Sequence, residues 1–209
     1  MVLVITLDQI ESATSIVYAE MQPTPQYCWP LLCENLGTEV WVKHENQTPI
    51  GSFKIRGGLM YFAHLAKSSE NLKSVVSATK GNHGQSVGFA ARRYGIPATI
   101  VVPNGNSIEK NNAMRSLGVN LLEHGDDFQS AREFAIKMAH ENSLTMIPSF
   151  DPLLVTGVAT YSLELLKAVK DLDIVYVPIG LGSGICGMLA VRDALKLKTK
   201  VCLLYTSDA

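Results

Sequence analysis

The sequence alternates between short apolar runs and longer amphipathic stretches, and this alternation constrains the fold more than any other feature. The apolar runs predict strands at 75–78, 99–102, 120–123, 145–147 and 174–177. Apolar residues repeat every three or four positions between them, which predicts helices at 54–66, 84–94, 108–117, 127–141, 153–169 and 184–197. Strands that alternate with helices in this way form parallel sheets with helices on both faces. We therefore predict an α/β fold, preceded by a helix at 8–20 and a strand at 39–43.

The composition describes a well-buried globular chain. Of 209 residues, 47% are hydrophobic and 18% are charged, and the net charge is -1. This charge gives no electrostatic basis for binding nucleic acid or an anionic membrane, and we expect neither partner. No apolar run approaches the ~18 residues of a membrane span, and the apolar start at 1–5 is too short for a secretory signal.

The four cysteines show neither Cys-x-x-Cys spacing nor a His/Cys metal pattern. This spacing suggests a reducing compartment, so we interpret them as incidental thiols and expect a cytoplasmic protein. The histidines are also scattered, without the paired spacing of metal ligands, and we predict no metal site. The cysteines are Cys28, Cys33, Cys186 and Cys202, and the scattered histidines are His44, His64, His124 and His140.

A lysine with apolar neighbours marks the first candidate site. Lys54 stands between Phe53 and Ile55, after a Pro-x-Gly turn and before a pair of glycines. A lysine in apolar surroundings loses solvation of its charged form, so its pKa falls and its amine becomes nucleophilic. This is what a Schiff-base lysine requires. The alternative is a snorkelling lysine at a helix start, with Arg56 pointing outward.

Two loops that each join a predicted strand to a predicted helix are the other candidates. Residues 77–86 read Ser-Ala-Thr-Lys-Gly-Asn-His-Gly-Gln-Ser, and the helix N-terminus there favours an anion such as a carboxylate. The alternative is an ordinary turn with Asn82 as the N-cap. Residues 178–187 read Pro-Ile-Gly-Leu-Gly-Ser-Gly-Ile-Cys-Gly, a loop whose backbone amides could hold a phosphate.

The second loop also contains a Gly-x-Gly-x-x-Gly pattern at 182–187, which is typical of dinucleotide-binding proteins. That function requires an acidic residue ~20 positions later to bind the ribose, and the candidate is Asp208. It also requires the pattern early in the fold, whereas here five predicted strands come before the strand that leads into it. The dinucleotide function is therefore a distant alternative.

The segment Lys-His-Glu-Asn-Gln-Thr-Pro-Ile-Gly-Ser-Phe-Lys-Ile-Arg-Gly at 43–57 resembles the cofactor-attachment segment of fold-type II pyridoxal-phosphate enzymes, most closely the threonine and serine dehydratases. The resemblance implies a two-domain, tryptophan synthase β-like architecture with pyridoxal 5'-phosphate as cofactor. Lys54 would form the Schiff base, and Phe53 would pack beside the pyridine ring. A small domain at 69–149 would be inserted into a large domain formed by 1–68 and 150–209.

The resemblance also assigns roles to the two loops. The first loop would bind the substrate carboxylate, and its asparagine would also contact the phenolic oxygen of the cofactor. The second loop would hold the cofactor phosphate, although Leu181 and Ser183 interrupt the glycine run of the dehydratases. The implied substrate-binding residues are Ser77, Thr79, Asn82 and His83, and the phosphate-binding residues are Gly180, Leu181, Gly182, Ser183 and Gly184.

The activity implied by the resemblance is that of an ammonia-lyase, which converts L-threonine or L-serine to a 2-oxo acid and ammonia. A β-replacement synthase and a racemase are alternatives with the same cofactor. Lys80 counts against the racemase, because related serine racemases carry a serine there as the second acid/base group. We also expect a homo-oligomer of the full-length form.

The last eight residues, 202–209, read as a translated sequencing adapter. We therefore expect the native sequence to diverge near Cys202 and to continue further. In the resembled family, the group that faces the pyridine nitrogen and any divalent-metal site lie beyond 201. A truncated, non-catalytic cofactor-binding fragment is thus a further alternative.

Overall fold

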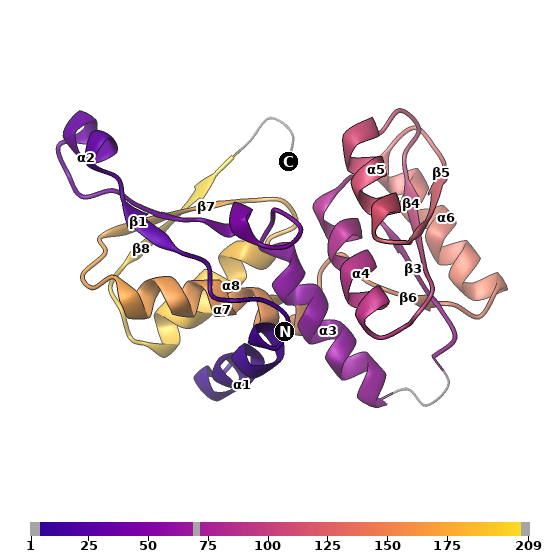
Figure 1. The fold of residues 1–209 in the computed structure, drawn as a ribbon, viewed down its shortest axis with the longest axis horizontal. Helices are drawn as coiled ribbons and strands as arrows, with labels where there is room; N and C mark the ends of the chain where they lie inside the picture. Colours follow the sequence, from indigo (N-terminus) through magenta and orange to yellow (C-terminus); the bar gives the residue numbers. More distant parts are fainter. Residues whose placement is uncertain (1–4, 69–71, 206–209) are drawn as a thin grey trace.

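The computed structural model describes residues 5–68 and 72–205, which form two α/β halves joined by one long helix (Figure 1). The elements are α1 (Leu7–Tyr18), β1 (Gln26–Cys28), α2 (Pro30–Leu36), β2 (Trp41–Lys43), η1 (Glu45–Gln47), α3 (Lys54–Ser68), β3 (Val75–Ala78), α4 (Asn82–Arg93), β4 (Ala98–Val102), α5 (Ile108–Ser116), β5 (Asn120–Glu123), α6 (Phe128–Glu141), β6 (Thr145–Met146), α7 (Pro152–Ala168), β7 (Ile174–Pro178), α8 (Ser183–Ala194) and β8 (Lys200–Leu204). The predicted strands and helices between 54 and 197 are all present, with small shifts at their ends.

One half, formed by β3 to β6 and the helices between them, is built on a parallel sheet with the strand order β5-β4-β3-β6. Helices cover both of its faces, as the sequence predicts. Val75 and Ile100 point to the face where α4 and α5 pack, whereas their neighbours Val76 and Val101 point to the face covered by α6. This alternation lets consecutive apolar residues in a strand all be buried.

The second half contains the parallel pair of β7 and β8, with α7 and α8 packed on one face. Val175 and Val177 of β7 enter that core. Their neighbours Ile174 and Tyr176 point the other way and remain 41% and 64% exposed. The apolar strand at 174–177 is therefore buried on one face only. Of the expected divergent tail, 202–204 belong to β8, and 206–209 lie outside the described residues.

The N-terminal region contains a strand and an α-helix that the sequence did not predict, in addition to the short 3-10 helix η1. Strand β1 pairs with β2 in antiparallel fashion, with Gln26 opposite Lys43. Helix α2 begins with a proline and ends at Gly37, which adopts a left-handed conformation (φ 65°). Its side chains are not buried in the core, and Figure 1 shows it at the outer end of the molecule.

Helix α3 links the cores of the two halves, and Figure 1 shows it between them. Its residue Leu59 packs in a cluster with α1, whereas Phe62, one turn later, belongs to the core of the four-stranded sheet. Glycines allow α3 and α7 to cross closely: a Cβ on Gly157 would lie 2.2 Å from the carbonyl oxygen of Arg56. Within the described part of the chain, no helix has the length and apolarity needed to cross a membrane.

Candidate active site

Lys54 is the first residue of α3, which confirms the prediction that it lies at a helix N-terminus. Its Nζ donates a hydrogen bond to Oγ of Ser183 at 3.0 Å. Ser183 is only 2% exposed, and burial lowers the pKa of the Lys54 amine. The alternative of a snorkelling lysine included an Arg56 that points outward. That part is wrong, because Arg56 is fully buried.

The second loop brings the N-terminus of α8 to this amine. Gly182 is the N-cap with a left-handed φ of 100°, and no side-chain hydrogen bond caps the helix. Its first backbone N–H groups are therefore available to an anion. A Cβ on Gly184 would lie 3.3 Å from Cζ of Phe53, so the loop packs closely beside that ring. Gly180 and Leu181 are exposed at its outer side.

Phe53 forms an aromatic wall next to the lysine. The Nζ of Lys54 lies 5.5 Å from the centroid of the Phe53 ring. The ring also packs against Tyr161 with a centroid distance of 5.6 Å and an interplanar angle of 45°. Burial raises the pKa of Tyr161, so its hydroxyl stays protonated. Phe53 is thus held where it could contact a planar ring near the amine.

The first loop presents a second uncapped helix N-terminus, that of α4. Gly81 occupies the N-cap and has no side-chain hydrogen bond to the helix, so Asn82 does not serve as the cap. Asn82 is exposed as the first helical residue, and Lys80 is exposed before it. The hydroxyl of Thr79 accepts a hydrogen bond from the N–H of Gly81 at 3.0 Å, which fixes the turn.

His83 and Ser77 lie deeper in the structure. His83 is buried, and its Nε2 has no hydrogen-bond partner within the described residues. Burial, together with the charge of Lys54, lowers the pKa of His83 from 6.5 to about 3, so the ring is neutral near pH 7. The hydroxyl of Ser77 donates to the carbonyl of Ile147 at 3.0 Å and joins β3 to the segment after β6.

A hydrogen bond ties the two helices of the site together. The hydroxyl of Ser86 in α4 donates to the carbonyl oxygen of Lys54 at 2.6 Å. The helices approach closely enough that a Cβ on Gly58 would lie 2.2 Å from that hydroxyl oxygen. The first loop and the lysine segment are therefore fixed relative to each other, and the structure brings all three predicted motifs together.

A buried ionic cluster, which the sequence did not predict, supports the start of α3. The guanidinium of Arg56 pairs with Glu45 at 2.8 Å and with Glu164 at 2.5 Å, and Lys43 also pairs with Glu164. Although burial opposes it, hydrogen bonds from Arg56 hold the pKa of the Glu164 carboxyl below its ordinary value. Thr24 and Tyr18 also donate hydrogen bonds to the two carboxylates. The available signal was a lone acidic residue in the apolar stretch at 153–169.

These features fit pyridoxal phosphate as a ligand. Lys54 supplies a desolvated amine, and the uncapped N-terminus of α8 supplies donors for a phosphate. The uncapped N-terminus of α4 is suited to a carboxylate, and His83 has a buried nitrogen without a partner in the part of the chain described. The fit rests on the chemistry of these groups.

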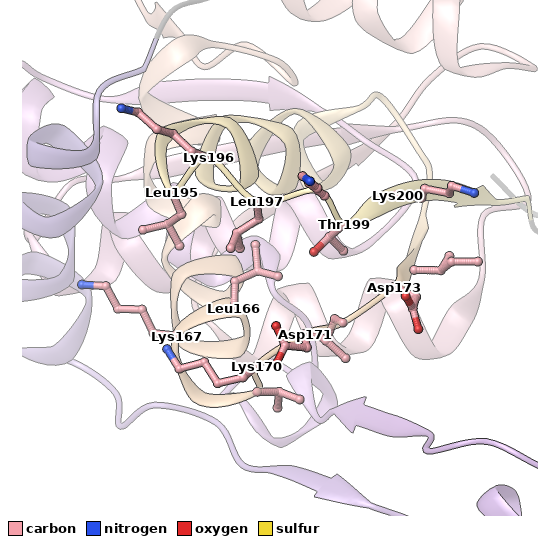
Figure 2. A pocket seen from close by; sticks show the side chains of 14 residues that line it. Leu166, Lys167, Lys170, Asp171, Asp173, Leu195, Lys196, Leu197, Thr199 and Lys200 are labelled. Carbon is pink, nitrogen blue, oxygen red and sulfur yellow. The ribbon is translucent and has the colours of Figure 1, made fainter.

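Two hollows lie near β7. One is lined by Phe53 and Tyr161 and extends along the exposed face of the strand to Tyr176. The other, shown in Figure 2, lies between the ends of α7 and α8, where β7 and β8 begin. Lys170 and Lys200 are among its lining residues. It contains none of the predicted site residues. It lies where β7 and β8 begin, whereas Ser183 follows the other end of β7.

Comparison with known proteins establishes the family. The sequence profile described as "Pyridoxal-phosphate dependent enzyme" matches residues 17–208. This chain therefore belongs to the pyridoxal-phosphate-dependent enzyme family, which confirms the resemblance and the fold class predicted from the lysine segment.

Curated relatives place the chain among proteins named for one activity. It is 36% identical over 204 residues to the biosynthetic L-threonine dehydratase of Haemophilus influenzae, covering 97% of this chain and 40% of that protein. It is 34% identical over 205 residues to the L-threonine ammonia-lyase of Thermotoga maritima, covering 98% of this chain and 51% of that protein. The chain thus spans about half the length of these relatives or less.

A solved structure with a different named activity has the same fold. The pyridoxal 5'-phosphate-dependent aspartate racemase superposes with a TM-score of 0.91 at 28% identity, covering 96% of this chain and 62% of that one. Proteins similar to this chain are thus named for two different reactions, elimination in the dehydratase and ammonia-lyase and racemisation in the aspartate racemase. The fold and family are settled at this level, whereas the reaction requires an argument from the residues.

Proposed function

We propose that this sequence belongs to a pyridoxal-phosphate-dependent ammonia-lyase that acts on L-threonine, L-serine or both. The observation that carries the proposal is the desolvated Lys54 amine, which lies 3.0 Å from Ser183 at an uncapped helix N-terminus. The identity to proteins named threonine dehydratase and threonine ammonia-lyase supports the same reaction class.

Each motif has a distinct role in this proposal. Lys54 attaches the cofactor, the loop at 180–184 holds its phosphate, and Phe53 packs against its ring. The N-terminus of α4, with Thr79 and Asn82, binds the substrate carboxylate through N–H and hydroxyl donors. Neutral His83 supplies a ring nitrogen that makes a hydrogen bond without adding charge. We assign Ser77 to the support of this loop, through its bond to Ile147.

Pyridoxal phosphate, when bound, supplies the electron sink that makes the α-proton of an amino acid acidic. The contribution of Lys54 is proton transfer, because burial lowers the pKa of its amine and so favours the unprotonated form that a base requires. Phe53 and Tyr161 exclude water from one side of that amine. Lys80 is exposed beside the first loop, and we propose that it does not act as a second base.

An absorbance experiment tests this function. The purified chain is mixed with pyridoxal phosphate, its visible spectrum is recorded, L-threonine is added, and 2-oxobutanoate is measured. We expect a visible band that shifts with substrate, together with product. The Lys54→Ala variant should lose both, whereas Lys67→Ala, an exposed lysine of the same helix, should keep both. Turnover retained by Lys54→Ala would refute the mechanism.

The same samples separate the remaining alternatives. Addition of a thiol together with L-serine reveals β-replacement, and chiral analysis of the residual amino acid reveals racemisation. A band that forms without any of these reactions indicates a cofactor-binding fragment. We keep three further proposals from the sequence: the division into 1–68 with 150–209 and 69–149, a homo-oligomer of the full-length form, and a cytoplasmic location.

A further inference from the structure

The structure brings together two cysteines whose spacing in the sequence predicts only incidental thiols. Cys28 is the last residue of β1, and Cys33 lies in α2 five positions later. Because α2 turns back toward the strand, the two Sγ atoms lie 3.4 Å apart. Both cysteines are reduced and partly exposed. The contact therefore forms a dithiol that small solutes can reach. Figure 1 shows α2 at the outer end of the molecule and α3, which begins at Lys54, in its middle.

The backbone holds this pair in place from both sides. The N–H of Val40 donates to Sγ of Cys33 at 3.2 Å, and the N–H of Trp29 donates to the carbonyl of Val40 at 3.1 Å. The N–H of Gly37 donates to the carbonyl of Cys33 at 2.9 Å. The hydrogen bond with Cys33 raises the pKa of the Cys28 thiol. The sulfur of Cys33 thus has a fixed donor in the Val40 N–H, whereas either thiol can donate across the contact of the two sulfurs.

We propose that Cys28 and Cys33 are a redox-active pair, which closes to an intramolecular disulfide on exposure to a low-molecular-weight disulfide such as oxidised glutathione. An S–S bond of ~2.0 Å requires the sulfurs to approach by only about 1.4 Å from their present contact. The bond would close a loop of few residues, so it constrains the unfolded chain less than a long-range disulfide does. It would act as a local clamp of α2 on β1.

The exchange balances in two steps. The thiolate of Cys33 attacks one sulfur of glutathione disulfide, the S–S bond breaks, and one glutathione thiolate leaves. The Cys28 thiol then gives up its proton and attacks the sulfur of Cys33, and the second glutathione thiolate leaves. Two protein thiols are oxidised, one small disulfide is reduced to two thiols, and the protons end on the released glutathione.

Mass spectrometry of the full 209-residue chain tests the pair. The reduced, folded protein is incubated with oxidised glutathione, the reaction is stopped with an alkylating agent, and intact mass and peptides are measured. We expect the chain to carry two alkyl groups, in place of the four on the reduced protein, and one peptide to carry the 28–33 link. Glutathione adducts that persist on the wild-type chain without a 28–33 link would overturn the proposal.

Matched variants identify the sulfurs. The Cys186→Ser/Cys202→Ser double variant should form the link as the wild-type chain does. The Cys28→Ser variant should stop as a stable mixed disulfide on Cys33, because the resolving thiol is absent. If a variant fails to fold, peptide mapping of the wild-type chain still decides. A link between Cys186 and Cys202, formed in preference to 28–33, would also refute the pair.

Discussion

Lys54 and Ser183 are 129 positions apart in the chain, yet the amine of the first donates a hydrogen bond to the hydroxyl of the second at 3.0 Å. Each is the first residue of its helix, α3 and α8. The amine thus lies near two helix N-termini, whose positive ends disfavour its protonation in addition to burial. This hydrogen bond connects Lys54, the residue proposed to attach the cofactor, to the loop proposed to hold the cofactor phosphate.

Replacement of Ser183 by alanine removes this hydrogen bond and leaves the helix start otherwise intact. In the proposed function this hydroxyl also donates to the cofactor phosphate, and the loss of one hydrogen bond to a charged ligand corresponds to about 1.5 kcal/mol, so we expect roughly tenfold weaker binding of pyridoxal phosphate. Titration of the visible absorbance gives the dissociation constant. Ser116→Ala, an exposed serine at the end of α5, is the matched control. Equal affinities of the two variants would contradict the assignment of Ser183.

The Arg56→Met variant should unfold far more easily than the wild-type chain. It leaves the carboxylates of Glu45 and Glu164 without their main partner in a buried site, a loss of about 3–5 kcal/mol. Urea denaturation followed by circular dichroism measures the change. Arg93→Met is the control, since Arg93 is exposed and pairs with Glu20 at the surface, where such pairs contribute ~1 kcal/mol or less. Similar losses in both variants would mean that the cluster has no special role.

Stability should fall as the pH decreases below 6.5, because of His83. The unfolded chain binds a proton on this ring near pH 6.5, whereas the folded chain resists it until about pH 3. The slope in that window reaches about 1.4 kcal/mol per pH unit. His83→Gln should flatten the slope, most visibly between pH 6.5 and 4.5, and exposed His64→Gln should leave it in place. Urea denaturation across this range is the measurement, and parallel slopes for wild type and His83→Gln would disprove the assignment.

Gly157→Ala should destabilise the crossing of α3 and α7. The added Cβ would lie 2.2 Å from the carbonyl oxygen of Arg56, so the helices must separate, at about 1–3 kcal/mol or more. Gly180→Ala is a useful contrast for stability, because its Cβ would meet no atom within 4 Å. Thermal unfolding of both variants gives the comparison. An unchanged melting temperature for Gly157→Ala would show that the crossing has room to adjust.

The sequence predicted what depends on local patterns. Alternating apolar runs located the parallel strands, and the residues around Lys54 indicated both a helix start and a lowered pKa. It could not predict α2, because the seven-residue helix has no buried face to create a periodic pattern. The pairing of Arg56 with Glu164 could not be predicted either, because the two residues are 108 positions apart in the chain. The contact of Cys28 with Cys33 depends on how α2 folds back, which spacing alone does not reveal.

The position of α3 limits how the protein can be divided. Its Leu59 packs with α1 in one half, and Phe62 is fully buried in the core of the other. An expression fragment that ends or begins near residue 68 would therefore remove Phe62 from the sheet that surrounds it. Complementation by two separately produced halves would work only if the second half carried its own copy of this helix. Lys54 and Phe62 belong to the same helix, so any fragment that retains this helix whole must retain both residues.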